Sequence, residues 1–145
     1  MVLKQTSVFL ENKCGRLYEV AKVLGDNGIN IMSLCVADAC EFAVARMIVE
    51  EPERARDILK EKGFTVKLSN VVACEVEDTP GCLAKVLKPL VDQEMNIDYV
   101  YCLIGKRGKN AIVIIRVEES EQAAGALKSC GFRCLSTDDI KSMQV

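Results

Sequence analysis

The chain contains one segment twice, and this duplication restricts the folds that it can adopt more than any other feature of the sequence. Residues 12–17 recur as 78–83 and residues 28–31 as 94–97 at one constant spacing, whereas residues 49–51 recur as 117–119 and 63–64 as 131–132 at a spacing larger by two. The two extra residues fall around 105–109, where Gly-Lys-Arg-Gly-Lys predicts a turn. Because insertions into true repeats are confined to turns, we expect two copies of one structural unit.

The hydrophobic period changes in the same order along each copy. In the first copy it predicts a strand over 6–10, a helix with Leu17, Val20, Ala21 and Leu24 on one face, strands over 29–36 and 42–49 joined by a turn at 37–41, a helix carrying Ala55, Ile58 and Leu59 that ends at Gly63, and a strand over 64–68. In the second copy it predicts a strand over 71–76, a helix within 81–94, strands over 97–104 and 111–117, a helix over 123–130 and a strand over 132–135. Pro89 falls inside the 81–94 helix, so we expect that helix to be kinked or to begin late.

The order strand, helix, strand, strand, helix, strand predicts an α+β fold with two tandem ferredoxin-like (βαββαβ) domains. Right-handed crossovers then place two helices on one face of a four-stranded antiparallel sheet in each domain. We expect domain 1 at residues 1–69, domain 2 at 70–136 and a tail at 137–145. The sequence Ser-Thr-Asp-Asp at 136–139 would cap a short last helix or fray.

Composition excludes several classes of function. With 19 basic and 21 acidic residues the net charge is −2, so no field of one sign would attract nucleic acid or an anionic membrane. The predicted central strands 44–49 and 112–117 lack the aromatic residues on which RNA-recognition sheets stack bases. No signal peptide and no apolar run of about 20 residues is present, so we expect a cytoplasmic protein with no membrane partner.

The cysteines and the lack of histidine argue against a metal site and against catalysis. A metallochaperone would need two cysteines in the first loop, and each copy has one. No CxxC pair occurs among the eight cysteines of the chain: Cys14, Cys35, Cys40, Cys74, Cys82, Cys102, Cys130 and Cys134. We expect reduced, mostly buried thiols, no metal and no cofactor. A cysteine nucleophile needs a base or a cation beside it, and only Cys14, between Lys13 and Arg16, comes close. We therefore expect no enzyme and no catalytic residue.

The repeated motifs resemble a known family. Asp78-Thr79-Pro80-Gly81-Cys82-Leu83, followed by Asn96-Ile97, is similar to the first loop and second strand of ACT domains, and residues 12–17 with 28–31 are similar to them again. The resemblance extends from about residue 4 to residue 135. The sequence departs from the family at Cys14, where proline is usual, and at Glu94, where glycine normally precedes the second strand.

The resemblance implies a regulatory module that binds a small amino acid at the interface between paired domains. It implies that Gly15 and Gly81 open a helix start to the ligand carboxylate, where free N–H groups and the helix dipole favour an anion. The other implied ligand-binding residues surround these glycines or open the second strand of each copy: Asn12, Lys13, Cys14, Arg16, Leu17, Asn30, Ile31, Asp78, Cys82, Leu83, Asn96 and Ile97.

The same residues also have purely structural interpretations. Asn12 and Asp78 are good N-caps, the two glycines suit a tight turn, and Asn30 and Asn96 can tie a strand start to the loop before it. A second set of four is more typical of core than of ligand contacts: Leu17, Leu83, Ile31 and Ile97.

Two functions follow from the sequence. The first is a free-standing amino-acid sensor that acts as a homodimer and alters a partner. The alternative is an interaction subunit that docks onto a metabolic enzyme without binding a ligand. The identity of the amino acid, and whether one or both copies bind it, stay open.

Overall fold

The computed structural model describes residues 1–37, 40–103 and 110–143, and the chain divides into two compact units. Lys4–Ser69 form the first unit, and Asn70–Val145 form the second unit together with Met1–Leu3. Each has the order strand, helix, strand, strand, helix, strand, which confirms the predicted ferredoxin-like fold.

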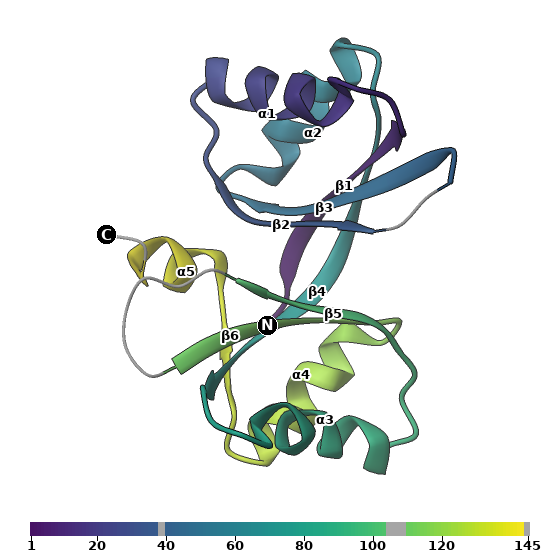
Figure 1. Ribbon diagram of the computed structural model, residues 1–145. Coiled ribbons are helices and arrows are strands. Elements are labelled where there is room, and N and C mark those ends of the chain that lie inside the picture. The colour runs from purple at the N-terminus through teal and green to yellow at the C-terminus, as the bar shows by residue number, and fades with distance from the viewer. Residues whose placement is uncertain (38–39, 104–109, 144–145) are drawn as a thin grey trace. The chain divides into compact units, whose positions relative to one another are not determined.

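The first unit is a four-stranded antiparallel sheet with two helices on one face (Figure 1). Its strands lie in the order β2-β3-β1-β4. The elements are β1 (Leu3–Glu11), α1 (Arg16–Asp26), β2 (Ile31–Ala37), β3 (Phe42–Val49), α2 (Pro52–Glu61) and the first part of β4 (Thr65–Glu77).

The second unit repeats this arrangement and adds one helix. Its strands lie in the order β7-β4-β6-β5, and α3 and α4 cover one face (Figure 1). After the second part of β4, its elements are α3 (Cys82–Asp92), β5 (Ile97–Leu103), β6 (Asn110–Val117), α4 (Ser120–Ser129), β7 (Arg133–Leu135) and α5 (Thr137–Met143).

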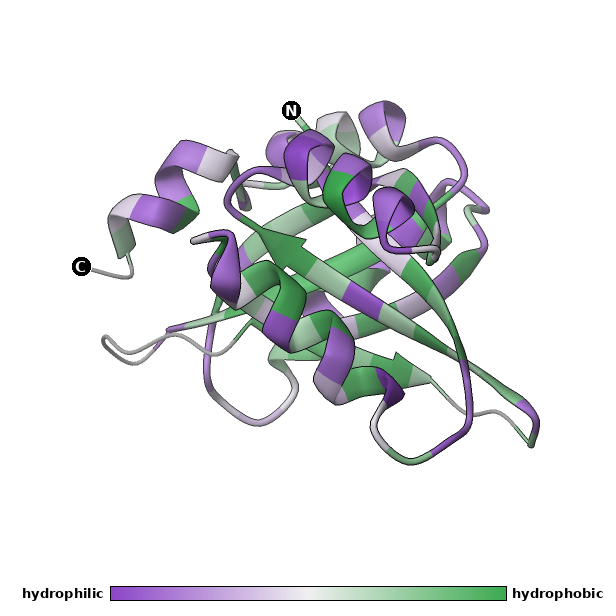
Figure 2. Ribbon diagram, turned by 90° about the horizontal axis from the view of Figure 1, so that it is seen from above, coloured by the Kyte–Doolittle hydropathy of each residue, from purple (hydrophilic) through white to green (hydrophobic). Residues whose placement is uncertain are grey.

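Each unit has its own hydrophobic core between its sheet and its helices. In the first unit Val20 and Leu24 of α1 pack with alternate residues of β1 and β3, such as Val8 and Ala45, which are register partners. In the second unit Val86 and Leu90 of α3 do the same. Figure 2 shows hydrophobic and hydrophilic residues alternating along the helices, as expected when one stripe faces a core.

One prediction about α1 was wrong. Leu17 and Ala21 were expected to share the buried face of α1 with Val20 and Leu24, but both are exposed. Ala21 points about 100° away from Val20, and Leu17, although at helical spacing from Val20 and Leu24, lies in the first turn of the helix. Pro89 was expected to kink α3 or to delay its start. The helix begins at Cys82 and carries the proline buried inside it, so its start is not delayed.

The junction between the two copies also differs from the prediction. Residues 64–68 and 71–76 were expected to form two strands, but β4 runs without interruption from Thr65 to Glu77. Ser69 and Asn70 adopt extended backbone because neither is the glycine or proline that would force a turn. The predicted turn at 37–41 includes residues 38–39, and the two-residue insertion lies at 105–109, so both fall outside the described residues.

The structure decides between the two alternatives expected for residues 136–139, a capped helix and a frayed end, in favour of the helix. The Ser136 N–H and hydroxyl donate to Oδ2 of Asp139 at 2.8 and 2.6 Å, and the Asp139 N–H donates back to Ser136 Oγ at 3.2 Å. This reciprocal pair is a capping box at the start of α5. It orders residues that the sequence alone allowed to fray.

The prediction that most thiols are buried was wrong. Only Cys74 and Cys134 are buried, two more are partly exposed, and four are exposed: Cys14, Cys40, Cys102 and Cys130. The exposed ones lie where the fold leaves side chains in solvent, namely a turn, the end of a hairpin, an edge strand and the residue after a helix.

Candidate functional site

The two turns that precede α1 and α3 have the same backbone conformation. Gly15 and Gly81 adopt φ values of 88° and 83°, in the left-handed region that only glycine enters easily. The hydrogen bonds match pair by pair: Lys13 N–H to Glu11 O and Thr79 N–H to Glu77 O, Arg16 N–H to Lys13 O and Cys82 N–H to Thr79 O, Glu19 N–H to Gly15 O and Lys85 N–H to Gly81 O. The sequence repeat is therefore a repeat of one specific turn.

Both turns leave a helix N-terminus open to solvent. Gly15 and Gly81 are the N-cap residues, and no described side chain caps either helix. A Cβ atom placed on either glycine would meet no described atom within 4 Å apart from its chain neighbours, so no other part of the chain covers these glycines. The N-cap interpretation of Asn12 and Asp78 is thus wrong, and the helix N–H groups can receive an anion.

The first turn is held by contacts to its hairpin and to its own charges. The Asn12 N–H donates to Glu41 O at 2.8 Å and its side-chain amide donates to Cys40 O at 3.4 Å. Lys13 lies 2.8 Å from the Glu11 carboxylate, and its hydrogen bond holds the pKa of Glu11 below its ordinary value. Both side chains are exposed to solvent, so this pair contributes little to stability.

Arg16 gives the first turn a cation that the second turn lacks. Its guanidinium lies 4.9 Å from the centre of the Phe64 ring and donates to Glu19 at 2.8 Å. A cation over an aromatic ring is worth about 0.5–1 kcal/mol at an exposed site. The equivalent position of the second unit is Cys82, which is partly buried against the core. The two turns share a backbone but present different side chains.

The hydrophobic residues of the predicted site separate into two groups. Leu17 and Leu83, which follow the two turns in the helices, are 37% and 46% exposed, so their assignment to the core was wrong. Ile31 and Ile97 pack partly buried against the two cores, as expected for the first residues of β2 and β5. The exposed leucines are available to a ligand or a partner.

Asn30 and Asn96 lie at the opposite end of each unit from the glycine turns. Gly81 precedes the first residue of α3, whereas Asn96 comes after its last, and Gly15 and Asn30 flank α1 in the same way. A helix of 11 residues is about 16 Å long at 1.5 Å per residue. Within one unit, therefore, a small amino acid cannot contact both the turn and the asparagine.

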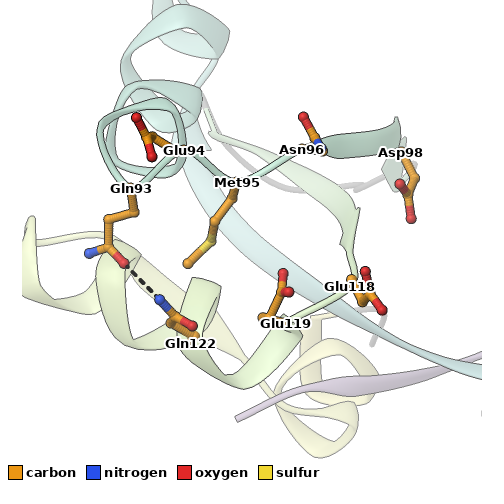
Figure 3. A pocket seen from close by; sticks show the side chains of 8 residues that line it. All are labelled: Gln93, Glu94, Met95, Asn96, Asp98, Glu118, Glu119 and Gln122. Atoms are coloured by element: carbon orange, nitrogen blue, oxygen red, sulfur yellow. Dashed lines mark hydrogen bonds between the residues drawn. The ribbon is translucent and has the colours of Figure 1, made fainter.

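Asn96 lines a pocket of about 290 Å³ in the second unit. Four carboxylates and three amides surround it with Met95, and none of these lining residues is basic: Gln93, Glu94, Asn96, Asp98, Glu118, Glu119 and Gln122 (Figure 3). Arg116 lies 3.8 Å from Asp98. The other carboxylates make this end of the unit acidic, which suits an ammonium group.

Glu94 adopts an unusual backbone conformation beside this pocket. Its φ of 55° is the one positive value among the described non-glycine residues. Gly28, its counterpart in the first unit, has a φ of 70°. A side chain in this region costs about 1–3 kcal/mol. The turn before the second strand of the second unit thus keeps the positive φ of its counterpart, although glutamate stands where the first unit has glycine.

The acidic pair Glu118–Glu119 beside the Asn96 pocket has a counterpart in the first unit, Glu50–Glu51, and one substitution between the copies distinguishes the surroundings of the two pairs. In the first unit Arg54 donates to Glu51 and to Asn27 O, both at 2.9 Å. Its counterpart in the second copy is Gln122, whose amide donates instead to Gln93 at 3.4 Å (Figure 3). The cation that offsets the acidic pair at 50–51 is therefore replaced by a neutral amide beside Glu118 and Glu119.

The sequence reasoning missed the acidic residues around Asn96. A signal was available, because Val-Glu-Glu at 49–51 and 117–119 is one of the repeated motifs. It served to align the copies, and no role was assigned to its carboxylates. Their approach to Asn96 depends on the loop between β6 and α4 meeting the loop between α3 and β5.

The described residues hold no group of three or more His, Cys, Asp or Glu side chains that could bind a metal ion. Among these same residues, no helix is both long and apolar enough to cross a membrane. The arrangement offers two recognition surfaces instead: a helix start for a carboxylate, and an acidic, amide-lined end for an ammonium group.

Comparison with known proteins identifies relatives of the whole chain. The family model of the ACT domain pair matches residues 1–143. The crystal structure of protein BT0572 from Bacteroides thetaiotaomicron is 38% identical, with a TM-score of 0.89 over 97% of this chain and 96% of that one. No protein of curated function matches the sequence.

Two further solved structures share the fold at low identity. The ligand-free regulatory subunit of aspartate kinase from Thermus thermophilus is 18% identical, with a TM-score of 0.64 over 87% of this chain and 91% of that one. The aspartate kinase from Clostridium acetobutylicum is 16% identical, with a TM-score of 0.58 over 87% of this chain and 32% of that one.

Proposed function

Because the chain belongs to the family of ACT domain pairs, we propose that it is a non-catalytic regulatory protein that binds a free amino acid. The observation that carries the proposal is the pair of uncapped turns at Gly15 and Gly81, which share one backbone conformation. A turn that served only to connect a strand to a helix would not need an open helix start, and capping that start with a side chain would stabilise the helix.

The carboxylate of the ligand binds in front of such a turn. The N–H groups of the first helical turn and the positive end of the helix dipole both favour an anion there. Asn12 and Asp78 lie exposed beside the turns and supply acceptors for the ammonium group of the same ligand. In the first unit Lys13 and Arg16 add positive charge, although Glu11 and Glu19 already pair with them.

The ammonium group of the ligand is recognised at the end of a unit where Asn30 or Asn96 lies. Asn96 can donate and accept through one amide, and Glu94, Glu118 and Glu119 line the same pocket. Because α3 keeps Asn96 about 16 Å from Gly81, a complete site needs the turn of one unit and the asparagine of another. A second copy of the chain supplies the missing half, so the protein acts as a homodimer.

A thermal-shift assay against the twenty amino acids tests the proposal. A ligand present at 100 times its Kd adds about 2.7 kcal/mol to the stability of the folded protein, which a melting curve detects readily. We expect a rise in Tm with one amino acid or a small group of related ones. An unchanged Tm with all twenty at 10 mM would contradict ligand binding.

One observation favours the alternative, a regulatory subunit that docks onto a metabolic enzyme without a ligand. Leu17, Tyr18 and Leu83 are exposed in the first turns of α1 and α3, and exposed apolar residues mark interaction surfaces when they cluster. The fold shared with the aspartate kinase regulatory subunit fits this alternative. In that case, replacing Leu17 and Leu83 by serine would abolish co-purification with the enzyme, and none of the twenty amino acids would change the Tm of the parent protein or of the variant.

A further inference from the structure

Two buried thiols of the second unit face each other across a strand pair. Cys74 of β4 and Cys134 of β7 are register partners, and both belong to the same core cluster. Their exposed fractions are 0% and 7%, and both are free thiols. No other cysteine pair occupies opposite positions of a strand pair in the described part of the sheet.

This placement suits a disulfide without movement of the backbone. Directly opposite residues of an antiparallel pair have Cα atoms about 4.5–5.5 Å apart. Disulfides span Cα separations of about 4.4–6.8 Å. Each thiol also donates to a nearby carbonyl oxygen, Cys134 to Ala124 O at 3.7 Å and Cys74 to Glu75 O at 3.9 Å.

The two thiols are chemically unequal. A hydrogen bond from Cys74 lowers the pKa of Cys134 to about 7, and the positive charges of Lys128 and the Met1 ammonium act in the same direction. The same interaction, together with burial, raises the pKa of Cys74. Cys134 is also the more exposed of the two, at 7% against 0%, so it serves as the nucleophile and Cys74 resolves the product.

Access to the pair is through β7. This strand has three residues, and its described partner is β4 on one side only. Short edge strands open at low free-energy cost, so a small uncharged molecule can reach Cys134 without unfolding of the whole unit.

We propose that Cys74 and Cys134 form a thiol-oxidation site that takes a hydroperoxide as its substrate and closes into a disulfide. The Cys134 thiolate attacks one oxygen of hydrogen peroxide, the O–O bond breaks, and hydroxide leaves and becomes water, giving a sulfenic acid. Cys74 sulfur then attacks the Cys134 sulfur, the S–O bond breaks, and the departing hydroxide leaves as water with the Cys74 proton. Two thiols are oxidised, and one peroxide is reduced to two waters.

Formation of the Cys74–Cys134 disulfide has a structural consequence for the second unit. The disulfide encloses the chain from β4 to β7, including α3 and α4. Cross-linking a long loop restricts the unfolded chain, so the oxidised protein melts at a higher temperature than the reduced one. It also keeps β7 paired, and α5 follows that strand directly.

Peptide mapping of the full-length protein tests the proposal. The reduced protein is treated with increasing hydrogen peroxide, blocked with N-ethylmaleimide under denaturing conditions, digested and analysed by mass spectrometry. We expect a Cys74–Cys134 cross-linked peptide at the lowest peroxide that changes the protein, a higher Tm, and reversal of both by dithiothreitol. Recovery of Cys74 and Cys134 as alkylated thiols, with oxidation only at exposed cysteines, would overturn it.

Two variants separate this site from unspecific oxidation. Cys130→Ser removes the exposed thiol closest in sequence to Cys134 and should leave the cross-link unchanged. Cys74→Ser should abolish the cross-link and leave a sulfenic acid on Cys134 that dimedone traps. A Cys130–Cys134 cross-link in the parent protein would contradict the assignment, and since the parent alone gives this result, the test does not depend on the folding of either variant.

Discussion

Gly81 precedes the first residue of α3 and Asn96 follows its last, so a helix of 11 residues separates the two parts of the second copy that resemble the ligand-binding motif of ACT domains. Gly15 and Asn30 flank α1 in the same manner. The motif is therefore continuous in sequence and divided in space. Under the proposal above, a ligand that contacts both parts bridges the turn of one copy of the chain and the asparagine of a second copy.

The first prediction concerns the two turn glycines. Gly15→Ala and Gly81→Ala should each cost about 1–2 kcal/mol of stability, because alanine at a positive φ is strained. They should also remove the Tm response to the amino acid, because the new methyl group occupies the open space before the helix.

A matched control for these variants is Gly63→Ala. Its φ of 87° produces the same strain, and a Cβ there also meets no described atom within 4 Å. It should lose stability and keep the ligand response, measured as a shift in Tm. If Gly63→Ala also loses the response, general destabilisation explains the effect and the turns have no special role.

The second prediction concerns completion of the site by a second copy. A chain with Gly15→Ala and Gly81→Ala and a chain with Asn30→Ala and Asn96→Ala should each fail to bind. A mixed dimer should regain about half of the sites, because the intact turns of one chain then meet the intact asparagines of the other. Isothermal titration of the purified mixed dimer measures this recovery, and its absence would contradict sites shared between copies.

The third prediction concerns the cap of α5. The hydrogen bonds from the Ser136 hydroxyl and N–H lower the pKa of Asp139, so the folded pKa lies below the unfolded value. The stabilisation is present above the unfolded pKa and is lost as the pH falls through the folded pKa. Amide hydrogen exchange in α5 should therefore accelerate as the pH falls below about 4, beyond its intrinsic pH dependence.

Ser136→Ala provides a comparison that removes the hydroxyl part of this cap and keeps the backbone part. Removal of a capping hydroxyl costs about 1 kcal/mol of helix stability. The variant should show faster α5 exchange at neutral pH and a smaller further acceleration below pH 4, because the backbone N–H of residue 136 still donates to Asp139. Exchange that accelerates as much in the variant as in the parent would show that another group is responsible.

The fourth prediction concerns the position at which the two acidic ends differ. Gln122→Arg should place a guanidinium beside Glu118 and Glu119, as Arg54 lies beside Glu51 in the first unit. The gain in stability should be about 0.2–1 kcal/mol, because the pair is exposed. The same change should weaken ligand binding at the Asn96 end through repulsion of an ammonium group.

Arg54→Gln is the reciprocal change and serves as the comparison. It removes the hydrogen bonds to Glu51 and Asn27 and should lower the free energy of unfolding by a similar amount. Denaturant unfolding measures both variants. If Gln122→Arg strengthens ligand binding, the Asn96 end does not receive the positive group of the ligand.

The fold was predictable because it depends on patterns that are local in sequence. The period-2 and period-3.6 runs gave the strands and helices, and the duplication supplied an independent check on each element. Where a prediction about the fold was wrong, the signal was weak: Ser69 and Asn70 could end a strand or continue it, and Leu17 stands at helical spacing from the core residues without facing the core.

The sequence by itself determined the two ACT units and their glycine turns, because each rests on residues a few positions apart, whereas it left open whether the last helix is capped. Only the tertiary structure decided which distant residues meet. It placed Asn96 among the carboxylates of the β6–α4 loop, at the far end of α3 from Gly81, and it set Cys74 opposite Cys134. These relationships depend on strand register and helix length together, and no local pattern in the chain encodes them.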